Sequence, residues 1–246
     1  MTIVPINMNI FYIPDIQGDQ AELDDQESRH AVRVLRLKTG DTVQLVDGRG
    51  GWFTAEITDD RSRNCQLRIT SHTSNYQPLS YSLHMAISPT KSMDRFEWFL
   101  EKATEMGISE VTPLICTRTE RSRVNMERME RIVVSAMKQS LRAFKPVLHS
   151  PVPMAGFIKE KRGGILGIAH CIPEGEGTQG RRTGLPELLN HTAYTMLVGP
   201  EGDFTEEEVG MAIQEGYTPF HLGESRLRTE TAGVYICAAL SFTGSK

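Results

Sequence analysis

The sequence predicts a small β-barrel followed by an α/β domain with a mostly parallel sheet. Residues 9 to 70 contain several short segments rich in β-branched and aromatic residues, separated by turn residues such as Asp47-Gly48. From residue 81 onward, apolar strand-like segments alternate with helical patterns, as in a parallel sheet with crossover helices. A chain of 246 residues is long enough for one small and one medium domain.

The first region has four predicted strands and one short helix. Val43 alternates with Leu45, and Phe53 with Ala55 and Ile57, which is the pattern of strands with one face on a core. So many short strands within about sixty residues favour a barrel. The predicted strands cover 9–14, 42–46, 52–57 and 65–70, a helix covers 26–35, and residues 72–80 form a linker.

The second region begins with a strand at 81–87 and continues with a helix at 94–106. Asp94 and Glu97 have the spacing of a capping box, and Gly107 suits a left-handed helix end. A longer helix is predicted over 125–144, because apolar residues recur there at helical spacing until Pro146. Further strands are expected at 111–117, 165–170, 194–199 and 218–223, and an apolar helix at 231–241.

Composition excludes several classes of protein. Hydrophobic residues make up 39% and charged residues 24%, which is ordinary for a globular protein, and no apolar run approaches the roughly 20 residues of a membrane span. The four cysteines are far apart, so we expect no structural zinc, and a reduced, cytoplasmic protein with no membrane partner. The net charge of −4 argues against indiscriminate binding to nucleic acid.

Two glycine-containing loops follow predicted strands, and ligands of open α/β sheets bind at the carboxyl ends of strands. They read GPEGDF at 199–204 and LGESRLRTETAG at 222–233. Glutamates at 206–208 follow the expected N-cap Thr205, and together with Glu201 and Asp203 they would repel a phosphate, so a neutral or cationic ligand suits the site better. Taken singly, GPEG is equally a plain turn, and Thr229 or Thr231 a cap for the last helix.

Together, GPEGDF and LGESRLRTETA resemble the paired motifs of the SPOUT-class methyltransferases, and more closely those of the RsmE family. That family methylates N3 of a uridine in 16S ribosomal RNA of the small subunit. The resemblance covers nearly the whole chain, since NIFYIP, RHAVRVLRLKTGD at 29–41, the stretch from Lys91 to Ile108 and QSLR at 139–142 fall where the family has comparable segments. The family usually has a second glycine at the position of Asp203, and commonly a glutamate at that of Lys138.

The resemblance implies a PUA-like barrel over residues 8–73 and a trefoil-knotted SPOUT domain over 79–246. It also implies a homodimer that binds S-adenosylmethionine, a cationic methyl donor, in the knot, without a metal. The residues carried over as cofactor-binding are Ala169, His170, Leu197, Gly199, Pro200, Glu201, Gly202, Leu222, Gly223, Leu227, Arg228 and Thr229.

Methylation of uridine N3 requires loss of a proton, and negative charge then spreads over the flanking carbonyl oxygens. We expect Arg228 to stabilise that charge, and Glu230 or Glu201 to accept the proton. Arginines suit phosphate geometry, although most charge runs are simply solvated. The residues expected to bind RNA are Arg29, His30, Arg33, Arg36, Arg118, Arg121, Arg123, Gln139 and Arg142.

Two other functions are compatible with the sequence. One is a different SPOUT RNA methyltransferase, acting on a tRNA guanine or a ribose 2′-hydroxyl. The other is a non-catalytic RNA-binding factor for ribosome assembly, which would not need the intact glycines of both loops. Binding of S-adenosylmethionine, measured by calorimetry, distinguishes the second from an enzyme.

Overall fold

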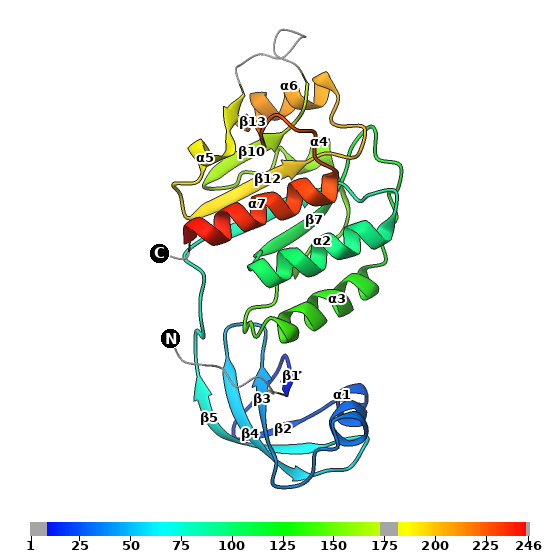
Figure 1. Ribbon diagram of the computed structural model, residues 1–246, viewed down its shortest axis with the longest axis vertical. Helices are drawn as coiled ribbons and strands as arrows, with labels where there is room; N and C mark the ends of the chain where they lie inside the picture. The colour runs from blue at the N-terminus through cyan, green and yellow to red at the C-terminus, as the bar shows by residue number, and fades with distance from the viewer. Residues whose placement is uncertain (1–8, 173–181, 245–246) are drawn as a thin grey trace. The chain divides into compact units, whose positions relative to one another are not determined.

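The computed structural model of the protein describes residues 9–172 and 182–244 and divides into two compact units (Figure 1). The first comprises the chain up to Pro78 together with 134–145, and the second comprises 79–133 and 146 onward. Residues 134–145 therefore fold with the first unit although they lie far along the chain. Within the described residues, no helix is both long and apolar enough to span a bilayer.

The first unit contains a five-stranded sheet in the order β1-β3-β4-β5-β2. Alternate side chains of β3 and β4, including Val43, Leu45, Ala55 and Ile57, are buried together with Phe11. Strand β2 was not predicted, because its sequence QAE has neither apolar alternation nor β-branched residues. The strands are β1 (Ile10–Tyr12), β2 (Gln20–Glu22), β3 (Thr42–Val46), β4 (Trp52–Asp59) and β5 (Gln66–Thr73).

The helix predicted over 26–35 consists of two parts. Helix α1 (Asp25–Arg29) is capped by Asp24, whose carboxylate accepts a hydrogen bond from the Glu27 amide at 2.7 Å. A π-helical turn, η1 (His30–Val34), continues it. Arg36 follows with a φ of 59°, so the chain leaves the helical direction there.

A second core of the first unit involves residues 134–145. Met137 and Ala143 are buried against Ile10, Val46 and Trp52. The Trp52 ring also stacks on Tyr76 at 4.4 Å between centroids, so part of the predicted linker is packed onto the unit. The Lys138 ammonium pairs with Glu27 of α1.

The second unit is built on an eight-stranded parallel sheet in the order β11-β13-β10-β12-β6-β7-β8, with β9 beside β7. The central strands alternate between two cores: Leu83, Met85 and Ile87 of β6 face one, and Ala86 faces the other. The strands are β6 (Ser82–Ile87), β7 (Glu110–Ile115), β8 (Val147–Leu148), β9 (Val152–Pro153), β10 (Ile165–Ala169), β11 (Thr183–Gly184), β12 (Ala193–Val198) and β13 (Thr218–His221).

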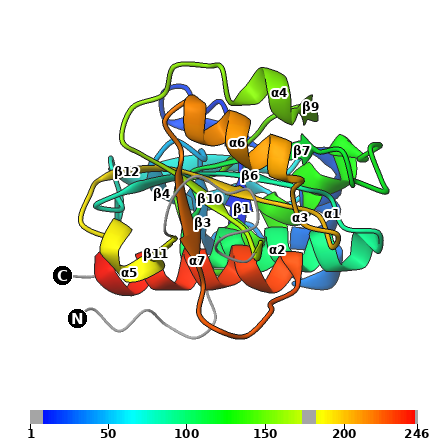
Figure 2. The same ribbon diagram turned by 90° about the horizontal axis from the view of Figure 1, so that it is seen from above.

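Helices cover both faces of this sheet, as Figure 2 shows for α4 and α6 on one side and α2 and α7 on the other. The first core packs against α2 (Met93–Met106), α5 (Leu185–Leu188) and α7 (Thr229–Gly244). The second packs against α4 (Met154–Phe157) and α6 (Glu206–Gln214). The mostly parallel α/β arrangement predicted from sequence is confirmed, whereas the knot stays a prediction.

One predicted helix end and one predicted helix cap are wrong. Helix α3 (Met126–Gln139) stops before residue 144, because Leu141 adopts a φ of 58° and the Arg142 amide turns back to the Met137 carbonyl at 3.0 Å. The expected capping box of α2 does not form. That helix begins at Met93 after Ser92, and Glu97 instead pairs with Arg128 of α3 at 2.6 Å. Gly107 ends α2 with a φ of 90°, as predicted.

Candidate functional site

A cavity of about 860 Å³ lies at the carboxyl ends of β10, β12 and β13 in the second unit. Three segments form most of its wall, at 169–172, 198–203 and 220–229, and Arg118, Arg182 and Ala232 complete it. All residues predicted to bind the cofactor line this cavity except Leu197. Leu197 is wholly buried and faces the core under α4 and α6, because successive side chains of a strand point to opposite faces of the sheet.

The GPEGDF loop makes a tight turn in which the Asp203 amide donates to the Pro200 carbonyl at 2.9 Å. A Cβ on Gly199 would lie 3.0 Å from the Phe204 ring, so glycine allows the backbone to pass close to that ring. Asp203 has a φ of 62°, the left-handed conformation that glycine and, less readily, aspartate adopt. The conformation thus suits the glycine that the RsmE family usually has here.

The Asp203 carboxylate also joins two segments of the wall. One oxygen accepts a hydrogen bond from the Phe204 amide at 2.8 Å, and the other accepts one from the Cys171 amide at 2.7 Å. The guanidinium of Arg118, which also lines the cavity, holds the same loop by donating to the Gly202 carbonyl at 2.7 Å. Arg118 therefore has a role in the loop, and its expected role in RNA binding stays a prediction.

The GPEG and LRTE loops are joined by a buried hydrogen bond. Thr229 Oγ1 donates to the Gly199 carbonyl at 2.9 Å, so this hydroxyl connects the loops rather than capping α7. Arg226 adds a longer bond to the Glu201 carbonyl at 3.4 Å. The Glu201 carboxylate accepts from the Lys91 amide at 2.9 Å. The structure thus brings together two loops that the sequence only suggested were related.

His170 is buried at the end of β10, and neither of its ring nitrogens has a hydrogen-bond partner among the described residues. Burial lowers the pKa of this histidine, against a smaller opposing effect of Asp203, so the ring is neutral at neutral pH. A neutral imidazole can both donate and accept a hydrogen bond. An unpaired, buried imidazole in the wall of a cavity is therefore suited to a polar group of a ligand.

The glutamates at the start of α6 face the site less than the sequence suggested. Thr205 caps the helix as predicted, and it forms a capping box with Glu208. The Glu208 carboxylate is buried, where it accepts from the Thr117 amide at 2.7 Å and the Thr205 amide at 2.9 Å. Of the acidic residues considered in the argument against phosphate, only Glu201 and Asp203 line the cavity.

A second cavity, of about 600 Å³, lies beside the first and shares Arg226, Leu227 and Arg228 with it. Glu230 lines this second cavity and is buried. One of its oxygens lies 3.8 Å from Nε of Arg95, and the other has no hydrogen-bond partner among the described residues. Trp98, half exposed on α2, also lines it, a feature that the sequence analysis missed.

The other residues expected to bind RNA are distributed over both units. In the first unit, Arg29 is paired with Asp25 at 2.5 Å, and Arg33 donates to Ser62 at 3.3 Å. Each of these bonds is exposed and is readily exchanged for another partner. The remaining ones are exposed or half-buried side chains, namely His30, Arg36, Arg121, Arg123, Gln139 and Arg142.

Comparisons with known proteins agree with this arrangement. A model of the RNA methyltransferase domain matches residues 77–241, and a model of the RNA methyltransferase PUA domain matches residues 23–70. A ribosomal RNA small subunit methyltransferase E from Synechocystis is 30% identical over 85% of this chain and 68% of its own length. The protein of that name from Rickettsia conorii is 29% identical over 93% and 92%.

Two solved structures have the same fold over nearly their whole length. A probable rRNA methyltransferase from Porphyromonas gingivalis superposes with a TM-score of 0.87 and is 38% identical, covering 97% of this chain and 99% of its own. A ribosomal RNA small subunit methyltransferase E from Neisseria gonorrhoeae, bound to S-adenosyl methionine, has a TM-score of 0.85 and 26% identity over 96% and 98%.

Proposed function

Because the chain belongs to the ribosomal RNA small subunit methyltransferase E family, we propose that it transfers a methyl group from S-adenosylmethionine to N3 of a uridine in 16S ribosomal RNA. The observation that carries the proposal is the cavity at the carboxyl ends of β10, β12 and β13. Its two glycine-containing loops are joined by the Thr229–Gly199 hydrogen bond.

The residues of the larger cavity fit S-adenosylmethionine. The volume of about 860 Å³ is within the range of small-molecule pockets. Gly199 and Gly202 expose backbone to the ligand, and the unpaired nitrogens of His170 offer a hydrogen bond. The carboxylates of Glu201 and Asp203 complement a positively charged sulfonium. When bound, that sulfonium supplies an activated methyl group.

The smaller cavity is the proposed site of the uracil. Arg228 lines both cavities, so it lies between donor and acceptor. Its side chain is exposed and makes no hydrogen bond or ion pair within the described part of the chain. A free guanidinium can therefore donate to the uracil carbonyl oxygens as they gain negative charge, and such donors commonly stabilise a transition state. The Trp98 ring offers a surface on which a base can stack.

Glu230 is a better candidate than Glu201 for the group that accepts the N3 proton. The Glu230 oxygen without a partner is buried at the second cavity, where it can accept a hydrogen bond from the base. The Glu201 carboxylate already accepts from the Lys91 amide and lines the first cavity instead. A proton acceptor must lie within hydrogen-bond reach of the proton it removes.

The oligomeric state, the form of the substrate and the identity of the two domains are proposed from the family resemblance. The enzyme would act as a cytoplasmic homodimer on an assembled small subunit, with a trefoil knot in residues 79–246 and a PUA-like RNA-binding barrel in 8–73. The arginines of α1 and η1, with those that follow β7, would contact RNA phosphates. The positive charge of these side chains and their exposure to solvent support this role.

The test is methyl transfer from radiolabelled S-adenosylmethionine to purified small subunits that lack the modification, followed by nucleoside analysis. We expect the label in 3-methyluridine. Label in another nucleoside would indicate a different RNA methyltransferase of the same fold. If the protein neither bound S-adenosylmethionine in calorimetry nor transferred label, the assembly-factor function would replace the enzymatic one.

A further inference from the structure

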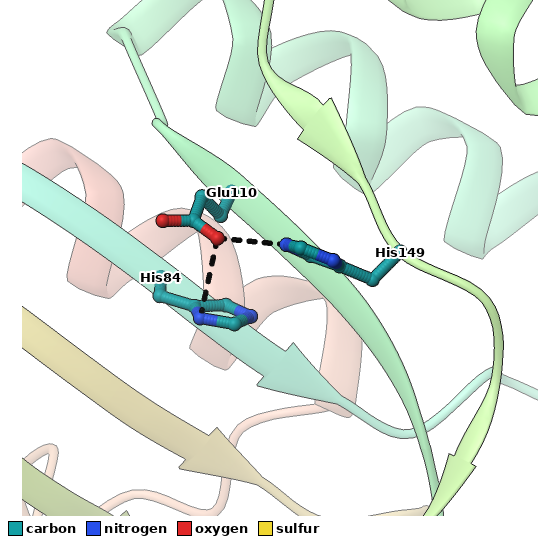
Figure 3. A group of neighbouring side chains, drawn as sticks. All are labelled: His84, Glu110 and His149. Carbon is teal, nitrogen blue, oxygen red and sulfur yellow. Dashed lines mark hydrogen bonds and ion pairs between the residues drawn. The ribbon is translucent and has the colours of Figure 1, made fainter. Parts of the chain in front are cut away.

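His84, Glu110 and His149 lie close together in the second unit (Figure 3). His84 of β6 is the register partner of Glu110, the first residue of β7. His149 follows β8, and its amide donates to the Val111 carbonyl at 2.9 Å. The Glu110 carboxylate lies between the two rings, 2.7 Å from Nε2 of His149 and 3.6 Å from Nδ1 of His84.

The hydrogen bonds of His84 define which of its nitrogens carries the proton. The Arg162 guanidinium lies 3.0 Å from Nδ1, and a guanidinium can only donate, so Nδ1 accepts. The proton is therefore on Nε2, which donates to Thr112 Oγ1 at 2.7 Å. The lone pair of His84 is therefore on Nδ1, the nitrogen that lies 3.6 Å from the Glu110 carboxylate. The hydrogen bond from Nε2 to Thr112 fixes this tautomer, as the outer hydrogen-bond partners of metal-binding histidines do.

We propose that His84 Nδ1, Glu110 and His149 Nε2 form a binding site for a divalent transition metal, with Zn²⁺ as its preferred ion. The three ligand atoms lie within 4.8 Å of one another. A tetrahedral zinc with ligands at roughly 2.0–2.2 Å requires separations of about 3.3–3.5 Å. The His84 and His149 rings are stacked with centroids 5.1 Å apart, so one ring, which we take to be the more exposed His149, must turn for both nitrogens to face the ion. Two imidazoles and one carboxylate are a common zinc ligand set, and the half-exposed Glu110 and His149 leave room for a water.

The positive charge of Arg162, next to the cluster, disfavours binding of a metal ion. Its positive charge lies at the lone pair that the metal would use. The guanidinium has two other partners, the Glu160 carboxylate at 2.6 Å and the Phe157 ring at 4.1 Å from its centroid. It can therefore turn away from His84 without losing every favourable contact. Arg162 competes with the metal and weakens its binding.

The position of the cluster indicates a structural role for the ion. Glu110 begins β7, and His84 is beside it on β6, near the amino ends of strands that run parallel to β10 and β12. The proposed cofactor cavity is at the carboxyl ends of the sheet. A bound ion would crosslink β6, β7 and the segment after β8. The site does not depend on the proposed methyl transfer.

The experiment is titration of the metal-free full chain with zinc chloride by calorimetry, together with the melting temperature with and without zinc. We expect one zinc per chain and a higher melting temperature when it is bound. His149→Ala and Glu110→Gln should each weaken binding by at least about 10-fold, since even outer-shell partners are worth 10–100-fold. Arg162→Met keeps an apolar stem over Phe157 and should strengthen binding by about 10-fold.

Two variants serve as matched controls. His191→Ala removes an exposed histidine of the same unit, and Cys171→Ser removes the exposed cysteine, so neither should change the zinc affinity. If wild-type protein did not bind zinc, or if binding survived both ligand substitutions, the site would be refuted. Loss of binding in Cys171→Ser would place the zinc elsewhere. An unchanged affinity in Arg162→Met would overturn the competition between guanidinium and metal.

Discussion

The hydrogen bond between Thr229 and Gly199 can be removed with little change in shape. Thr229→Val replaces the hydroxyl by a methyl group and leaves the Gly199 carbonyl without its donor. Thr229 is buried, whereas Thr231, two residues further along α7, is exposed. Thr231→Val is therefore the same chemical change at a site where no such bond is lost.

The expected cost follows from the burial of the acceptor. Leaving a buried carbonyl unsatisfied costs about 1–3 kcal/mol. Gly199 borders the cavity, where water can restore part of the bond, so we expect about 1–2 kcal/mol. For a chain of this size that corresponds to a fall in melting temperature of about 2–8 °C. If the loops also shift, S-adenosylmethionine binds more weakly. Its affinity falls by about tenfold for each 1.4 kcal/mol of binding free energy that is lost.

Thermal unfolding followed by circular dichroism measures the first effect, and calorimetry with S-adenosylmethionine measures the second. Thr229→Ser retains the hydroxyl and should keep the affinity of the wild type. The free energy of unfolding of Thr231→Val should lie within about 0.5 kcal/mol of the wild-type value. The reasoning fails if Thr229→Val melts with the wild type, or if Thr231→Val is equally destabilised.

Three further predictions concern the same cavity. Arg228→Ala should lower kcat by about 10²–10³ when both RNA and S-adenosylmethionine are saturating, and unchanged turnover would remove Arg228 from the mechanism. Asp203→Gly should be more stable than Asp203→Ala by about 1 kcal/mol, because both lose the carboxylate but only alanine is strained at a φ of 62°; equal melting temperatures would contradict this. Because burial lowers the pKa of His170, its contribution to stability is complete above the ordinary histidine pKa of about 6.5 and falls as the pH drops from there toward the lowered value. His170→Asn should flatten that part of the pH–stability curve, and an unaltered curve would exclude His170 as its source.

Local patterns were sufficient to predict most of the fold. Apolar alternation located β3 and β4, and Gly107 marked the end of α2. The predictions failed where a tertiary contact decided the outcome. Glu97 pairs with Arg128 on another helix rather than capping its own, and Leu141 ends α3 in a conformation that its residue type disfavours.

In the candidate site too, features formed by consecutive residues could be predicted, and features formed by tertiary contacts could not. The glycine-containing loops could be predicted because their residues are consecutive. The second cavity could not, since Trp98 comes from a helix far from Arg228 in the sequence. The cluster of His84, Glu110 and His149 was missed for the same reason, because strand pairing brings together residues with no motif spacing.

The participation of residues 134–145 in the first unit affects how the protein folds during synthesis. Trp52 and Val46 emerge early, but Met137 and Ala143, which bury them, are made much later. Translation proceeds at roughly 5–20 residues per second, so the apolar surface around Trp52 and Val46 stays exposed for several seconds before residues 137–143 are synthesised. The N-terminal unit therefore completes its core only after translation has passed well into the second, and during that interval it is exposed to chaperones and to aggregation.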